Sequence, residues 1–110
     1  MSYLSDKQLS RKNALILIDI QEKLIKAIYK RDSIIQNIRK LLKAYQILDS
    51  NILISEQNSQ KLGKTIIELI PEGTFTKIEK MEFSVANNQV FIEEIKSKKI
   101  THLIICGIET

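Results

Sequence analysis

Residues 14–19 read Ala-Leu-Ile-Leu-Ile-Asp, a short uninterrupted apolar run that ends in a carboxylate. Such a run is typical of a parallel strand buried on both faces, because a strand with one solvent-facing side alternates apolar and polar residues. Residues 51–55 (Asn-Ile-Leu-Ile-Ser) and 101–106 (Thr-His-Leu-Ile-Ile-Cys) have the same character, and residues 75–78 form a shorter run. The sequence therefore predicts four strands, the first two of them buried.

Helical patterns separate these strands. Apolar residues recur at helical spacing between Ile34 and Leu48, and Asp32-Ser33 offers a cap for that helix. Residues 62–70 predict a short helix closed by Pro71, and Asn87 or Asn88 can cap a third helix that reaches residue 95. Alternation of strands and helices without hairpin turns indicates right-handed crossovers and a parallel sheet covered on both faces. The predicted class is α/β, a Rossmann-like three-layer fold with only its first four strands present.

Composition narrows the class of protein. The 110 residues fit one domain, 1–110, and the 44% apolar and 27% charged residues are ordinary for a globular chain. The net charge of +4 comes without a clustered basic face, so no nucleic-acid partner is expected. One cysteine cannot form an internal disulfide, and neither a secretory signal nor a membrane-spanning run is visible, which predicts a cytoplasmic protein.

Polar residues at the carboxyl ends of parallel strands are the first candidates for function, because the loops there converge on one crevice. Asp19, Glu56, Lys80 and Glu109 all lie at or just after predicted strand ends. Taken singly, Asp19 fits equally well as a carboxylate that accepts backbone N–H bonds, and Lys80 fits a surface lysine. Only their combination favours a site.

Four short motifs follow these strands in order along the chain. They are Asp19-Ile20-Gln21, then Glu56-Gln57 with Leu62-Gly63, then Lys80-Met81-Glu82-Phe83-Ser84, and finally Cys106-Gly107-Ile108-Glu109-Thr110. In this order and spacing they resemble the signatures of isochorismatase-like cysteine hydrolases, over nearly the whole chain. The first motif is weak by itself, whereas Lys-x-x-Phe-Ser and Gly-Ile-Glu-Thr together are specific.

The resemblance implies a catalytic triad of Asp, Lys and Cys, in which Asp19 and Lys80 match the first two members. It places the nucleophile three residues beyond Thr110, so we expect a chain truncated before that cysteine and inactive alone. Cys106 lies inside the predicted fourth strand and is expected to be a small core residue. The resemblance also implies substrate-binding positions and a non-proline cis peptide at Ile108–Glu109. The implied substrate-binding residues are Gln21, Phe83, Ile108 and Glu109.

A chemical reason links these residue types. A free thiol has a pKa of about 8.5 and is mostly protonated at neutral pH. It needs a carboxylate to accept its proton and a cation to stabilise the thiolate, roles that suit Asp19 and Lys80. The thiolate would attack an electrophilic carbon, typically an amide-like carbonyl in this family, and backbone N–H groups would hold the oxyanion. The expected partner is a small-molecule substrate.

Neither a metal nor another cofactor is expected. Nicotinamidase members of the family carry a metal site with Asp-x-His after the second strand, where this chain has Ser55-Glu56-Gln57. The one histidine, His102, begins the fourth strand, where a structural role is favoured over a ligand's.

Two other functions can be compared with that of a hydrolase. The residues fit equally a non-catalytic remnant that acts as a binding or oligomerisation module. We expect homo-oligomers, because no predicted helix covers the fourth strand and an uncovered apolar edge favours association. A dinucleotide-binding domain is disfavoured, since residues 19–23 after the first strand contain no glycine to approach a pyrophosphate.

Overall fold

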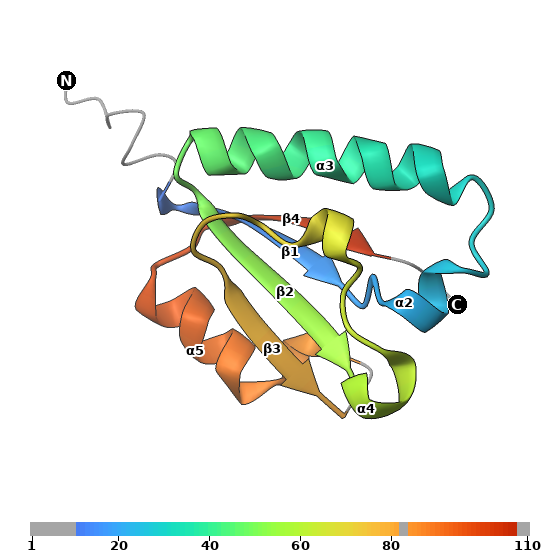
Figure 1. The fold of residues 1–110 in the computed structure, drawn as a ribbon. Helices are drawn as coiled ribbons and strands as arrows, with labels where there is room; N and C mark the ends of the chain where they lie inside the picture. The colour runs from blue at the N-terminus through green and yellow to red at the C-terminus, as the bar shows by residue number, and fades with distance from the viewer. Residues whose placement is uncertain (1–10, 82–83, 108–110) are drawn as a thin grey trace, which may run out of the picture.

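Four parallel strands form one sheet in the order β3-β2-β1-β4 (Figure 1). The computed structural model describes residues 11–81 and 84–107. β1 (Asn13–Ile18) lies between β2 (Asn51–Gln57) and β4 (His102–Gly107), and β3 (Thr76–Lys80) pairs with the other side of β2. The predicted α/β class, the four parallel strands and the internal position of the first strand are confirmed.

Helices cover both faces of the sheet and complete three layers (Figure 1). The long helix α3 (Arg31–Ile47) lies on one face and α5 (Gln89–Ser97) on the other. The remaining helical elements are short: α2 (Glu22–Ile25), α4 (Ser59–Leu62) and the 3₁₀ turns η1 (Ile67–Leu69) and η2 (Val85–Asn87). None of the described helices is long and apolar enough to cross a membrane.

The strand residues of β1 alternate between two separate apolar cores. Leu15 and Leu17 contribute to the core beneath α3, whereas Ala14 and Ile16 contribute to the core beneath α5. All four side chains are fully buried. Because both faces are covered, the strand has no solvent side and its sequence is uniformly apolar.

The sequence predicted the start of α5 correctly but not the start of α3. Asn88 caps α5, since its side-chain oxygen accepts hydrogen bonds from the backbone N–H groups of Val90 and Phe91 at 2.9 and 3.2 Å. The predicted Asp32-Ser33 cap of α3 is wrong. That helix begins earlier, after Lys30, which has left-handed backbone angles and makes no side-chain cap bond. Asp32 instead lies in the first turn, where a carboxylate is favoured by the helix dipole.

The helix predicted for residues 62–70 is also wrong. Gly63 ends α4 with a φ of 84°, and the chain then runs extended until η1. Two backbone bonds hold the extended part against the segment after β1: Glu22 N–H donates to Lys64, and Ile66 N–H donates to Ile20. Tertiary hydrogen bonds therefore replace the helical bonds that the apolar spacing suggested.

β4 is the edge strand of the described sheet beside β1. Its register places Ile104 opposite Leu15, on the α3 face, and Ile105 opposite Ile16, on the α5 face. Ile104 is 46% exposed and Ile105 is 61% exposed. The strand therefore presents apolar side chains to solvent on both faces of the sheet.

Candidate functional site

An ion pair joins two strand ends at the carboxyl edge of the sheet. Asp19 follows β1, Lys80 is the last residue of β3, and β2 lies between these strands. The Lys80 Nζ atom lies 2.9 Å from Asp19 Oδ2, which confirms the predicted approach of the two side chains. The Lys80 side chain is fully buried and that of Asp19 is 14% exposed. A buried ammonium requires a nearby counter-charge, so each group fixes the other.

The backbone turns at Asp19. Its φ of 58° lies in the left-handed region, which few residues other than glycine adopt and which Asp and Asn tolerate best. Its N–H still donates to the Ser55 carbonyl at 3.1 Å, continuing the β1–β2 ladder by one bond. The turn therefore leaves the strand while its backbone remains anchored to β2.

Ser55 is a site residue that sequence reasoning missed. Its hydroxyl donates to Asp19 Oδ1 at 3.1 Å, and the residue is fully buried. Both oxygens of the Asp19 carboxylate therefore accept a hydrogen bond, one from Ser55 and one from Lys80. The available signal was a single hydroxyl at the end of the apolar run 51–55, which is too common to indicate a role.

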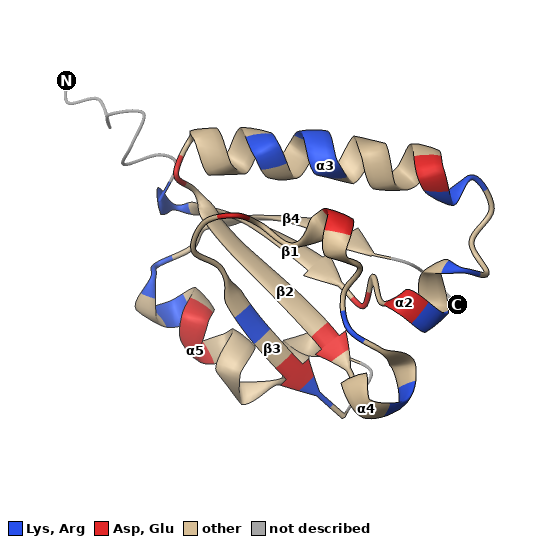
Figure 2. Cartoon of the chain, in the orientation of Figure 1, with Lys and Arg blue, Asp and Glu red and all other residues tan. Residues whose placement is uncertain are grey.

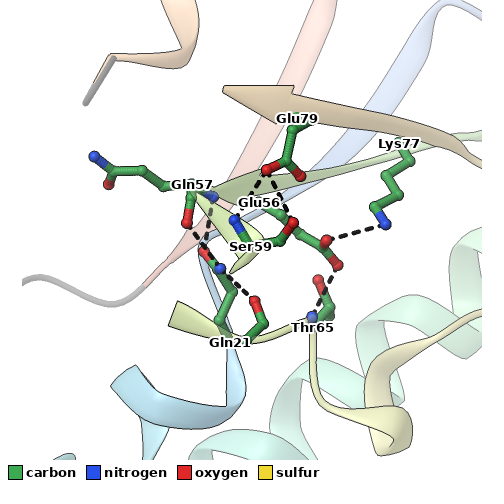
Figure 3. Close-up of polar contacts among 8 residues, drawn as sticks. Gln21, Glu56, Gln57, Ser59, Thr65, Lys77 and Glu79 are labelled. Atoms are coloured by element: carbon green, nitrogen blue, oxygen red, sulfur yellow. Dashed lines mark hydrogen bonds and ion pairs between the residues drawn. The ribbon is translucent and has the colours of Figure 1, made fainter. Parts of the chain in front are cut away.

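Gln21, expected to contact substrate, is fully buried and bonded to the backbone at the end of β2 and in the loop after α4 (Figure 3). Its amide nitrogen donates to the carbonyls of Gln57 at 3.0 Å and Gly63 at 2.7 Å. Its amide oxygen accepts the Gln57 N–H at 2.8 Å. These three bonds tie the end of β2 and the loop after α4 to the segment after β1. Substrate contact by Gln21 stays a prediction.

Glu56 anchors the same loop from inside β2 (Figure 3). The residue is 2% exposed, and its carboxylate accepts the Thr65 N–H at 2.8 Å and pairs with Lys77 at 3.1 Å. Burial by itself would raise the pKa of Glu56, but the Thr65 bond and the Lys77 ammonium outweigh it and hold the pKa below its ordinary value. Glu56 therefore acts as a charged anchor between β2 and the loop that contains Thr65.

The lowered pKa of Glu56 predicts a pH-dependent contribution to stability. Its stabilisation is complete above the unfolded pKa of about 4.5 and is lost as the pH falls through the lower folded pKa. We expect Glu56→Gln to lower the unfolding free energy by roughly 1 to 2 kcal/mol at pH 7, and the difference from the original chain to shrink below pH 4.5. Urea unfolding between pH 7 and 3 measures this, with Glu68→Gln at an exposed position as control. A constant difference across that range would contradict the assignment.

Several expected site residues lie outside the described part of the chain. These are Phe83, Ile108 and Glu109, together with the expected cis peptide. Cys106 lies in β4, as predicted, and packs partly buried against the core beneath α3. Burial raises the pKa of its thiol, which disfavours the nucleophilic thiolate.

Side chains that could bind a metal are not clustered in residues 11–81 and 84–107. No cluster of three or more His, Cys, Asp or Glu side chains within these ranges could hold a metal ion. His102 is exposed at the start of β4, with Nδ1 2.9 Å from the Thr101 hydroxyl. Figure 2 shows basic and acidic positions interspersed along the described ribbon, on α3, α5 and β3 among other elements.

Comparison with known proteins identifies the family. Residues 13–110 match the isochorismatase domain family. The chain is 32% identical over 100 residues to isochorismatase domain-containing protein 2 of Xenopus laevis and 34% identical over 96 residues to that of Rattus norvegicus. These matches cover 91% and 87% of this chain, but only 48% and 45% of the relatives, so the chain spans about half their length.

Solved structures show the same fold. A MAR1 ribonuclease from Caenorhabditis elegans superposes with a TM-score of 0.77 at 29% identity, covering 91% of this chain and 52% of that one. An octameric hydrolase of unknown specificity from Escherichia coli gives a TM-score of 0.77 at 18% identity, covering 90% and 51%, which supports the fold alone. Because the family match extends over residues 13–110 and agrees with the sheet and the motifs, the chain belongs to the isochorismatase family.

Proposed function

We propose that this chain supplies the acid–base half of a cysteine hydrolase that cleaves a C–N or similar bond in a small molecule. Asp19 is the general base and Lys80 the stabilising cation, and the nucleophile is the cysteine that the family resemblance implies beyond Thr110. The observation that carries the proposal is the buried 2.9 Å pair between Lys80 and Asp19 at the carboxyl edge of the sheet. Charged pairs at the carboxyl ends of parallel strands are candidates for chemistry, because the loops there converge on one crevice.

The proposed reaction begins with transfer of the thiol proton to Asp19. The Lys80 ammonium stabilises the negative charge on the sulfur, which then attacks the substrate carbonyl carbon. When the C–N bond breaks, the proton held by Asp19 passes to the departing amine, and an acyl-thioester remains. Asp19, again a carboxylate, next accepts a proton from a water molecule that hydrolyses this thioester and frees the acid. The thiolate leaves as the C–S bond of the thioester breaks, and Asp19 returns the proton to the sulfur, which restores the thiol and the Asp19 carboxylate.

The proposal is tested by comparing two lengths of the protein. We expect residues 1–110 to show no thiol-dependent turnover of activated amides or esters, because Cys106 is the only cysteine and its thiol is held in β4 with a raised pKa. A form extended through the downstream reading frame, with a cysteine in the nucleophile position, should turn substrate over. Turnover by the short chain that is abolished by Cys106→Ala would contradict the assignment of the nucleophile.

A second function, as a binding or oligomerisation module, is favoured by one observation. The edge strand β4 exposes Ile104 and Ile105 on opposite faces, and exposed edges with apolar side chains promote pairing with other chains. A homo-oligomer would cover this surface, and one structural neighbour is described as octameric.

We expect Ile105→Lys to shift the isolated chain from larger species towards monomer, because a charged side chain on an edge strand opposes pairing. Sedimentation velocity measures the change. Ile67→Lys is the matched control, since Ile67 is 82% exposed in η1 and not part of β4. Equal effects of the two variants, or none from Ile105→Lys, would remove β4 as the association surface.

A further inference from the structure

Three neighbouring strands each contribute one residue to the candidate site. Ser55 in β2 is registered with Ile18 in β1 on one side and with Ile78 in β3 on the other. Asp19 follows Ile18 directly, and Lys80 is two residues beyond Ile78. Ser55 therefore belongs to the central strand between the two charged residues.

We propose that Ser55 is a positioning residue of the Asp19–Lys80 pair. This inference rests on the proposed function for its catalytic meaning, but the arrangement itself is structural. The hydroxyl of Ser55 holds Asp19 Oδ1 at 3.1 Å, and this leaves Oδ2 directed at Lys80 Nζ at 2.9 Å. The Ser55 carbonyl also holds the Asp19 N–H at 3.1 Å. One residue thus fixes both the backbone and the carboxylate of Asp19.

The Asp19 carboxylate needs such an external donor. The last torsion of an aspartate side chain is broad, with no sharp rotamer to set the plane of the two oxygens. The salt bridge alone holds one oxygen, and the carboxylate can still turn about that contact. A second donor on the other oxygen removes this freedom. Since Ser55 is fully buried, water does not replace its hydroxyl without rearrangement of the site.

A matched pair of substitutions isolates the hydroxyl. Ser55→Thr and Ser55→Val add nearly the same volume at a buried position, and only threonine keeps the hydroxyl. Ser55→Ala removes the hydroxyl without adding volume, so it remains informative if the larger side chains disturb folding. Any cost of overpacking is shared by the first two variants and cancels in their comparison.

The readout on residues 1–110 is the acetylation rate of Lys80 by acetic anhydride, followed by peptide mass spectrometry. A buried, paired amine reacts only when the site opens locally. Loss of a hydrogen bond to a charged group should raise the open population, and with it the Lys80 rate, roughly tenfold. We expect this rise in Ser55→Val and Ser55→Ala, and a rate near the original in Ser55→Thr. Alkylation of Cys106, partly buried in β4, reports changes away from the Asp19–Lys80 pair and should not change.

Equal Lys80 rates in Ser55→Val and Ser55→Thr would overturn the proposal, as would a rise matched by Cys106 alkylation. In a nucleophile-bearing form, Ser55→Val should lower kcat roughly tenfold with KM unchanged, and Ser55→Thr should restore it. A failure of the proposed function gives a different result. In that case the Lys80 acetylation rates would follow the expected order, but neither the original chain nor any variant would turn substrate over.

Discussion

Asp19→Asn is expected to lower kcat/KM by about a hundred- to ten-thousand-fold in a form of the protein that carries the nucleophile. The amide is almost the same size as the carboxylate and can still accept a hydrogen bond from Ser55 or Lys80. It cannot take the thiol proton at neutral pH, so the thiolate would form far less often. Steady-state hydrolysis of an activated amide, with thiol alkylation as an independent measure of thiolate formation, checks this.

The matched control is Glu72→Gln, the same acid-to-amide change at an exposed position before β3. It should leave kcat/KM unchanged. Both variants are compared at a temperature where circular dichroism shows them folded. An Asp19→Asn enzyme within about twofold of the original rate would remove Asp19 from the mechanism.

The same substitution is expected to have a large effect on stability. Asp19→Asn removes the carboxylate that lies 2.9 Å from the fully buried Lys80 ammonium. Breaking a buried pair by removing one charge typically costs about 3 to 5 kcal/mol. The lower end of that range applies here, since Asp19 retains 14% exposure and its charge is partly solvated. Urea unfolding of residues 1–110 measures the loss.

A double variant separates the loss of the Asp19–Lys80 pair from other effects. Adding Lys80→Met to Asp19→Asn removes the buried ammonium and keeps an unbranched side chain, so most of the lost stability should return. The contrary result is additivity of the two losses in unfolding free energy. If Lys80→Met costs as much in the Asp19→Asn background as it does alone, the two residues are energetically independent and the ion pair does not hold the site together.

The sequence predicted those parts of the fold that depend on burial. The run 14–18 is apolar because both faces of β1 are covered, and its position predicted an internal strand. Asp19 and Lys80 were candidates because they stand at strand ends, where parallel topology brings residues together, and the resemblance to isochorismatase-like hydrolases then singled them out. Their pairing is a consequence of strand order, which alternation of strands and helices restricts to few arrangements.

The loop after β2 was not predictable in the same way. The spacing of Leu62, Ile66 and Leu69 suits a helix, but the backbone there bonds to the segment 20–22 instead. The side chains of Gln21 and Glu56 hold the same region. Gln21 bonds to Gln57, which is 36 residues away, and Glu56 bonds to Thr65, which is 9 residues away. Ser55 was missed for a similar reason, because its contact with Asp19 spans 36 residues and leaves no local pattern.

The central claim is that Asp19 and Lys80 serve a cysteine nucleophile other than Cys106. The most direct measurement is intact and peptide mass spectrometry of the extended protein, quenched with acid during turnover of an activated ester. We expect an acyl adduct on the cysteine in the nucleophile position that the resemblance implies after Thr110, and we expect this adduct to be lost in Asp19→Asn while Cys106 stays unmodified. Substrate consumption with the adduct on Cys106, or with an equal adduct in Asp19→Asn, would contradict it.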